Sequence, residues 1–223
     1  MSTPDQAVAN FSRYFAPSIA ARIADGELAV PGGIRAPVVV LFSDVRGFTA
    51  IAESLPPVAM ADQLNEYFAA MVECVFHHDG ALDKFIGDAL LAWWGVPDAR
   101  ADDGQRALAA AVEMMDAMAM LNARWAREGR PGWDIGIGIH GGEAFVGNIG
   151  SPQRLDFTII GDTVNTANRV CRLAAEGEIL ITESIAARLG ESGDAWPRHA
   201  RPDLSLARRH GPPLTVWQVG RAA

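Results

Sequence analysis

An uninterrupted run of five apolar residues, Val38–Phe42, constrains the fold of this chain more than any other feature of its sequence. A strand that is apolar at every position does not alternate between a wet and a dry face, so it is buried on both. We therefore predict a fully buried strand over Ala36–Ser43. A chain of 223 residues buries roughly 70% of its unfolded surface, which is enough to fold without a disulfide or a metal ion.

Helical periodicity and strand alternation divide most of the remaining chain into successive elements. The expected elements are, in chain order, a helix after Pro56 that ends near Gly80, a hairpin of Ala81–Ile86 and Ala89–Trp94 hinged at Gly87-Asp88, a long helix from Asp102, a second hairpin of Ile135–Ile139 and Ala144–Ile149, a strand Arg154–Ile160, a helix Thr163–Ala175, and strands Ile179–Thr182 and Leu214–Val219. This order predicts an α+β fold: a ferredoxin-like βαββαβ core sheet, extended by further strands, with helices covering one face.

The N-terminal region precedes this series. Apolar residues there recur at three- and four-residue steps, which predicts one amphipathic helix containing Phe11, Tyr14, Phe15, Ile19 and Ile23. We expect residues 1–35 to be a helical lead-in and residues 36–223 to be one domain, because no internal repeat or low-complexity linker divides them.

The charge balance excludes several classes of partner. Nineteen basic and 27 acidic residues leave a net charge of −8, which disfavours binding to nucleic acid or to an anionic membrane surface. No apolar stretch is long enough to span a bilayer, and no basic-then-apolar leader follows Met1. Cys74 and Cys171 fall in helical patterns and are expected to be reduced, packed thiols. We expect a cytoplasmic globular protein without membrane insertion.

The first motif with chemical content is Phe42–Thr49. Asp44 stands where the buried strand ends, and ligands favour the carboxyl ends of strands. Gly47 lets backbone N–H groups approach a ligand closely, and successive turn amides can cradle a phosphate. A helix cap or a simple turn explains the same residues equally well.

The second motif is Asp83–Asp88, where the acid at the hairpin turn also fits a simple turn signal. Lys84 lies among apolar residues of a strand, so it needs either solvent or a partner. If the hairpin lies beside the first strand, Asp88 and Asp44 come together, and two neighbouring carboxylates that repel each other indicate a bound divalent cation. Two cations about 3.5–4 Å apart stabilise the attacking and leaving oxygens in phosphoryl and nucleotidyl transfer.

The third motif is Phe157–Arg169. Its Asn165 and Arg169 are four residues apart in a predicted helix, so they project from one face, one turn apart. The guanidinium fork of arginine matches phosphate oxygens. A solvated helix face would explain the same spacing without any ligand.

Four blocks, FSDVRGFT, DKFIGDALLAWWG, GIGIHGGEAFVGNIGS and FTIIGDTVNTANRV, occur in this order and resemble the catalytic domain of class III nucleotidyl cyclases over roughly residues 36–220. The resemblance implies an adenylate cyclase, which converts ATP to 3′,5′-cyclic AMP and pyrophosphate by in-line attack of the ribose 3′ oxygen on the α-phosphorus. It also implies two Mg²⁺ or Mn²⁺ ions per active site, and a head-to-tail homodimer whose two sites are each built from both chains.

The resemblance also implies the roles of individual residues. The expected metal ligands are Asp44, Asp88 and the carbonyl of Val45; the substrate-binding residues are Lys84 and Thr158 at the purine with Gly47, Phe48 and Thr49; Asn165 orients the ribose and Arg169 stabilises the pentavalent phosphorus. A further basic residue near the C-terminus is expected to bind the terminal phosphates. Arg208 and Arg209 are the candidates, with Arg46 as another residue that can reach phosphate.

The choice of base follows from hydrogen-bond chemistry. Lysine has only donors, so Lys84 suits adenine N1, while the hydroxyl of Thr158 can accept from N6. In family members that select guanine the lysine position is an acid. Threonine replaces the aspartate of the mammalian adenylate enzymes and occurs in a branch that includes bicarbonate-responsive enzymes. Because threonine also donates, a guanylate cyclase is the rival interpretation.

A degenerate cyclase-like domain, which serves only to sense nucleotides or to dimerise, is a second rival, and a diguanylate cyclase is a third. Gly141–Phe145 mimics the signature of diguanylate cyclases but lacks its second acid. The complete Asp44/Asp88 and Asn165/Arg169 pairs argue against a degenerate domain.

Overall fold

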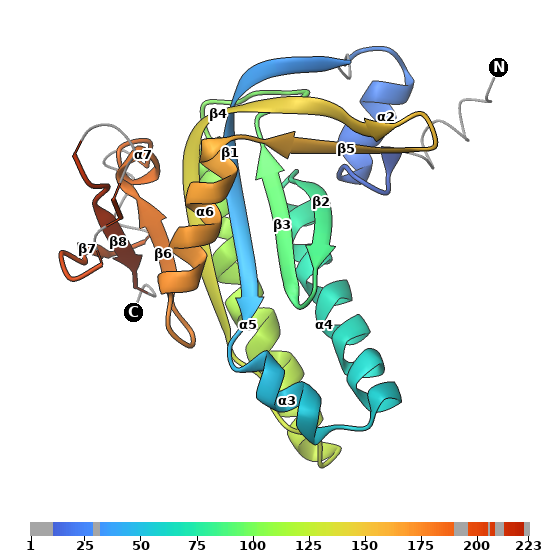
Figure 1. Ribbon diagram of the computed structural model, residues 1–223, viewed down its shortest axis with the longest axis vertical. Coiled ribbons are helices and arrows are strands. Elements are labelled where there is room, and N and C mark those ends of the chain that lie inside the picture. The colour runs from blue at the N-terminus through green and yellow to red at the C-terminus, as the bar shows by residue number, and fades with distance from the viewer. Residues whose placement is uncertain (1–10, 29–31, 190–195, 205, 208–211, 221–223) are drawn as a thin grey trace.

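The computed structural model describes residues 11–28, 32–189, 196–204, 206–207 and 212–220 (Figure 1). Within these residues, eight strands form one sheet that has helices on both faces. The strands are β1 (Gly33–Val45), β2 (Ala81–Ile86), β3 (Ala89–Trp94), β4 (Ile135–Ser151), β5 (Arg154–Ile160), β6 (Ile179–Thr182), β7 (Arg198–Ala200) and β8 (Val216–Val219). The helices are α2 (Pro17–Ala24), α3 (Phe48–Ser54), α4 (Pro57–His77), α5 (Asp103–Arg127), α6 (Asp162–Leu173) and α7 (Glu183–Ala186).

The sheet confirms the predicted α+β class and its ferredoxin-like core. The strand order is β2-β3-β1-β4-β6-β8-β7, and β5 pairs with β4 off this path. The first four strands pair in antiparallel fashion, and together with α4 and α5 they belong to the βαββαβ unit. β6 adds to β4 in parallel, and β8 and β7 continue the sheet in antiparallel fashion.

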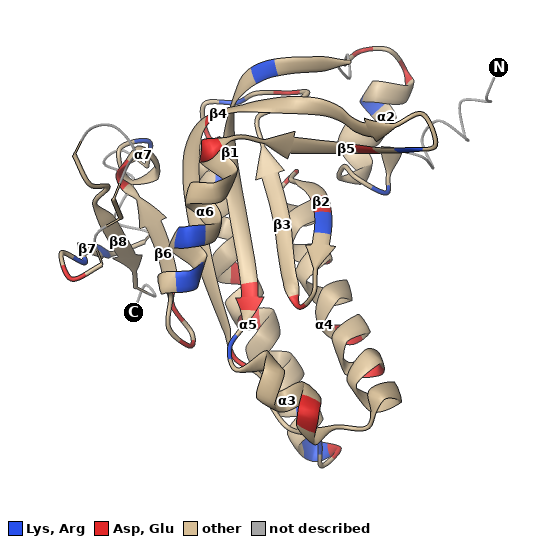
Figure 2. Ribbon diagram, in the orientation of Figure 1, with Lys and Arg blue, Asp and Glu red and all other residues tan. Residues whose placement is uncertain are grey.

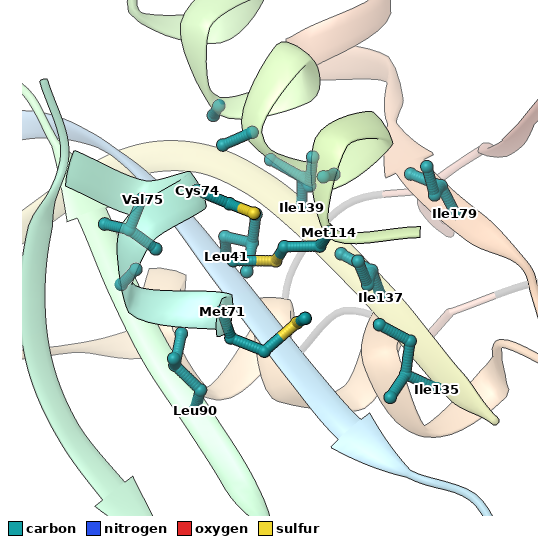
Figure 3. Packing of buried hydrophobic residues seen from close by; sticks show 14 of the residues in the cluster. Leu41, Met71, Cys74, Val75, Leu90, Met114, Ile135, Ile137, Ile139 and Ile179 are labelled. Carbon is teal, nitrogen blue, oxygen red and sulfur yellow. The ribbon is translucent and has the colours of Figure 1, made fainter. Parts of the chain in front are cut away.

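One face of the sheet packs against α4 and α5. Val39 and Leu41 of β1 point to this side, where they contact a core that includes Met71 of α4 and Met114 of α5. Figure 3 shows Leu41, Met71 and Met114 together with Ile137 of β4 between the helix layer and the strands. This core holds β1 in the interior of the sheet, between β3 and β4.

The opposite face is covered as well, so the prediction that helices cover one face only is wrong. Val38 and Val40 of β1 point to this second side and pack with Ala20 of α2 and with Ala167 and Cys171 of α6. The reason is already present in the run Val38–Phe42, because a strand that is apolar at every position requires an apolar layer on each side.

Within residues 11–28, the single continuous helix predicted here is interrupted between Phe11 and Pro17. The helix α2 begins only at Pro17, whose ring favours an extended residue before it, and Ala16 has ψ 143°. Phe15 instead forms an isolated β-bridge with Ala81, and the N–H of Ala16 donates to the carbonyl of Gly80 at 3.3 Å. The segment therefore packs against the start of β2.

A second correction concerns β4, which is one continuous strand where a hairpin was predicted. The turn that reverses the chain lies between β4 and β5. Gly141-Gly142 resembles a turn signal, but glycines in this strand make room for α6. A Cβ on Gly138 would lie 2.1 Å from the backbone N of Cys171, and one on Gly142 would lie 2.7 Å from Thr163 Oγ1. The glycines thus permit close helix–strand packing.

The expectation about the two cysteines is confirmed, because Cys74 and Cys171 are free, buried thiols. His140 is buried in β4, with Nδ1 2.8 Å from Thr182 Oγ1. Among the described residues, no helix combines the length and the apolar character needed to cross a lipid bilayer.

Candidate active site

Two carboxylates lie next to each other at the C-terminal end of β1. Asp44 lies near the C-terminal end of β1, and Asp88 lies in the tight turn between β2 and β3. The pairing of Ser43 with Leu90 brings that turn alongside β1, where the N–H of Val45 donates to Asp88 Oδ2 at 3.2 Å. The predicted meeting of the two acids is therefore present in the structure.

The electrostatics of this pair suit a divalent cation. Burial and the neighbouring Asp44 carboxylate raise the pKa of Asp88 to about 6. A raised pKa means that the second negative charge is costly here, and a cation would relieve that cost. Carboxylate oxygens are the donors that Mg²⁺ and Mn²⁺ prefer. The residues present therefore fit the metal that the sequence motif predicts.

Arg46, which the sequence suggested can reach phosphate, hydrogen-bonds to Asp44 in the structure. Its Nη2 donates to both the carbonyl oxygen and the carboxylate Oδ2 of Asp44, each at 3.2 Å. The guanidinium also lies beside Gly136 of β4, where an added Cβ would come within 2.9 Å of its Nε. In this structure Arg46 orients Asp44 and fills the gap between β1 and β4.

The turn after β1 contains Gly47, and α3 begins directly after it with Phe48 and Thr49. Gly47 has φ +67°, in the left-handed region that glycine adopts readily, and no atom lies within 4 Å of where its Cβ would stand. The ring of Phe48 packs edge-on against Trp133, with the centroids 6.1 Å apart. The Phe48 side chain therefore packs against the core, whereas Thr49 is exposed.

The predicted purine-reading pair, Lys84 and Thr158, is assembled within one chain. Lys84 Nζ donates to Thr158 Oγ1 at 3.1 Å, across from β2 to β5. Both residues line a cavity of about 340 Å³, and Asn165 of α6 lines it too. Apolar side chains form much of the remaining wall, among them Phe42, Ile86, Leu91, Ile149, Ile159 and Val164.

Asp83, to which the sequence motifs assign no role in the site, binds Thr158 of this pair through a hydrogen bond. It sits at a β-bulge in β2, and its side chain is 0% exposed. Its carboxylate accepts from Trp93 Nε1 at 3.1 Å, from Thr158 Oγ1 at 2.8 Å and from the N–H of Ile159 at 3.1 Å. The sequence feature that could have revealed Asp83 is its position two residues after Ala81, on the strand face that points inward. A charged side chain is not expected on that face.

Asn165 and Arg169 lie on the exposed flank of α6, one turn apart as predicted. Both line a larger cavity of about 590 Å³, and Asn165 also lines the smaller one. Arg169 Nη1 donates to the carbonyl of Ala207 at 3.1 Å, so the C-terminal region borders this cavity. Arg208 and Arg209, the candidates for binding terminal phosphates, lie outside the described residues.

The two halves of the candidate site are separate in a single chain. As the described residues define them, neither cavity is lined by Asp44 or Asp88. Figure 2 shows the same separation of charge, with acidic positions at the end of β1 and at the start of β3, and basic positions on α6. One chain thus presents an acidic half and a purine- and phosphate-reading half at different places.

The sequence profile of the adenylate and guanylate cyclase catalytic domain matches residues 34–206. An adenylate cyclase of Anabaena cylindrica is 37% identical over 158 residues, which are 67% of this chain and 30% of that protein. Adenylate cyclase 1 of Rhizobium meliloti is 32% identical over 171 residues, 76% of this chain and 26% of that protein. The chain therefore spans less than a third of the length of these two curated relatives.

Solved structures agree with the sequence match. The adenylyl cyclase CyaB of P. aeruginosa superimposes with a TM-score of 0.79 at 31% identity, covering 86% of this chain and 97% of that one. The guanylyl cyclase Cya2 superimposes with a TM-score of 0.77 at 34% identity, covering 86% of this chain and 96% of that one. The chain therefore belongs to the class III family of adenylate and guanylate cyclase catalytic domains.

Proposed function

We propose that this chain cyclises ATP to 3′,5′-cyclic AMP and pyrophosphate, at two sites shared between two head-to-tail copies of the chain. The observation that carries the proposal is the convergence of Asp44 and Asp88, whose repulsion a divalent cation would relieve. The separation of these acids from the cavities around Lys84 and Arg169 supports a site completed by a second copy. Adenylate cyclases among the relatives support the choice of reaction.

The acidic half of the site prepares the nucleophile. Asp44, Asp88 and the carbonyl of Val45 would hold two Mg²⁺ or Mn²⁺ ions, which when bound lower the pKa of the ribose 3′ hydroxyl and neutralise phosphate charge. Arg46 holds the Asp44 carboxylate in place by donating to it. The backbone N–H groups at Gly47 would donate to phosphate oxygens.

The other half positions the nucleotide and stabilises developing charge. Asn165 would orient the ribose so that its 3′ oxygen is in line with the α-phosphorus and with the departing pyrophosphate oxygen. Arg169, one turn further along α6, would donate to the oxygens of the pentavalent phosphorus, where negative charge accumulates. The 3′ O–P bond forms as the bond to pyrophosphate breaks.

The hydrogen bonds around Asp83 support adenine as the base. The carboxylate of Asp83 can only accept, so Thr158 directs its single hydroxyl proton to it. Thr158 is left with oxygen lone pairs, one of which already accepts from Lys84. The other suits the amino group of adenine, whereas guanine presents an acceptor, O6, at the same place. Lys84 adds a donor for adenine N1.

The proposal is tested by product analysis with ATP and with GTP, in Mn²⁺ and in Mg²⁺. The parent chain should form cyclic AMP, and Lys84→Glu should shift the ratio of kcat/KM for ATP over GTP toward GTP by about 10- to 100-fold, because each mispaired buried polar group costs about 1–3 kcal/mol. Absence of any cyclic nucleotide would overturn the proposal. Cyclic GMP as the main product of the parent would instead favour a guanylate cyclase, as Cya2 is named.

Replacement of Asp83 should weaken the preference for ATP over GTP, although Asp83 acts only through Thr158. In Asp83→Asn the amide can donate to Thr158, whose hydroxyl is then able to turn and donate to guanine O6. We expect the ATP-over-GTP ratio of kcat/KM to fall about 10-fold. The matched control is Asp62→Asn, an exposed position on α4. An unchanged ratio in a folded Asp83→Asn variant would contradict this role.

A further inference from the structure

Three side chains with metal-binding atoms converge on the helix layer, outside the residues assigned to the nucleotide site. His77 is the last residue of α4, His78 follows it as the C-cap, and Glu113 lies in α5. One ligand atom from each of the three lies within 4.8 Å of the other two. Residues so distant in sequence meet here only because α4 and α5 pack side by side.

The three groups share a single point of contact. Glu113 Oε2 lies 2.9 Å from His77 Nδ1 and 2.7 Å from His78 Nε2. The two imidazole rings have centroids 4.9 Å apart and are tilted by 37°. Ligands at about 2.0–2.2 Å from a tetrahedral Zn²⁺ ion stand about 3.3–3.6 Å apart. The two nitrogen–oxygen distances would therefore have to open by roughly 0.4–0.9 Å to admit the ion.

The backbone fixes this geometry before any ion binds. The carbonyl of His78 accepts from Trp94 Nε1 at 2.8 Å and from Arg106 Nη1 at 3.2 Å, which ties the end of α4 to β3 and α5. The His78 side chain is 23% exposed, whereas that of His77 is 71% exposed. His78 is thus held firmly, and the exposed side chain of His77 leaves a path for an ion from solvent.

The surroundings favour a cation. The site lies at the C-terminal end of α4, where the helix dipole is negative. A cavity of about 370 Å³ between α4 and α5 has three acidic lining residues, Glu73, Glu113 and Asp116, against two arginines. Cys74, one turn before His78, also lines this cavity, but it is buried in the apolar core (Figure 3) and is not among the three converging groups.

We propose that His77, His78 and Glu113 bind one Zn²⁺ ion, with water completing the coordination. Two imidazoles and a carboxylate form a donor set that zinc favours, whereas Mg²⁺ prefers oxygen ligands alone. The ion would link the end of α4 to α5, close to the start of β2, the strand that carries Asp83 and Lys84. This site takes a different ion from the Asp44/Asp88 pair and does not depend on the cyclase reaction.

The test is Zn²⁺ titration by calorimetry in an Asp44→Asn/Asp88→Asn background, so that the acidic pair does not contribute. We expect one Zn²⁺ per chain, and a rise in Tm on the order of 5 to 10 °C once free Zn²⁺ reaches about 100 times its Kd. His77→Gln/His78→Gln and Glu113→Gln should each weaken binding by about 100-fold or more. His199→Gln, on β7, is the matched control and should bind as the background does.

Co²⁺ provides a second readout that does not rely on affinity. A four- or five-coordinate Co²⁺ ion at this site should give visible absorption that disappears in the single variant His77→Gln, whose exposed side chain contributes little to folding. Equal Zn²⁺ binding with and without the two histidines would overturn the proposal. So would a complete lack of saturable binding, which would leave the three groups as a hydrogen-bonded ion pair.

Discussion

Asp44→Asn should reduce cyclic AMP formation by roughly 10³-fold or more, which corresponds to about 4 kcal/mol of lost transition-state stabilisation. Asparagine keeps the shape of the side chain but removes one of the two negative charges that would hold the cations. The measurement is the initial rate at saturating ATP with Mn²⁺. Circular dichroism and Tm show whether the variant is folded, and Asp62→Asn on the exposed surface of α4 serves as control.

The same variant has a second observable consequence. Asp44 is one cause of the raised pKa of Asp88, which stands at about 6, and burial is the larger cause. Removing the Asp44 charge should therefore lower the pKa of Asp88 while leaving it above the ordinary value. NMR titration of the carboxyl carbon in the metal-free protein measures this directly. Activity within about tenfold of the parent in a folded variant would contradict the role assigned to Asp44.

Mixing two inactive variants should restore activity if the sites are shared. Asp44→Asn damages the acidic half, and Arg169→Ala damages the phosphate-reading half, where loss of one donor costs about 10²–10³ in rate. A dimer of one variant chain with the other has one site with both defects and one site with neither. If subunits exchange freely in an equal mixture, about half of the dimers are mixed, and activity should reach about a quarter of the parent.

The structure supplies a matched control for this experiment. Asp44→Asn mixed with Asp88→Asn should stay inactive, because both changes lie in the same half of the site. Differently tagged chains show by co-purification whether mixed dimers form. Mixed dimers without recovered activity would mean that one chain supplies both halves.

The strand and helix order was predictable because local patterns are strong in this chain. The all-apolar run Val38–Phe42 identifies the central strand, and Gly87-Asp88 identifies the first hairpin, whose turn glycine has φ +64°. The meeting of Asp44 and Asp88 follows from placing that hairpin beside the central strand. These features depend on residues close together in sequence, or on one correct strand pairing.

The sequence predictions are wrong where a residue that looks like part of a local motif contacts an element far away in the sequence. Gly141-Gly142 predicts a turn, but glycines along β4 accommodate α6, which begins some twenty residues later. Asp83 lies within the predicted strand Ala81–Ile86, where no motif gives it a partner, whereas the structure places it at a β-bulge and hydrogen-bonds it to Thr158 on β5. No periodicity within one segment reports such partners, because they exist only after the sheet is assembled.

The close fit between β4 and α6 limits how this protein can be redesigned. Asn165 and Arg169 project from α6, whose distance from the sheet depends on the glycines of β4. Even a methyl group at Gly138 would overlap the backbone of Cys171. A mutation there would shift both projecting residues together without altering either. Mutational libraries aimed at new substrates should therefore vary the cavity walls and leave this glycine spacer unchanged.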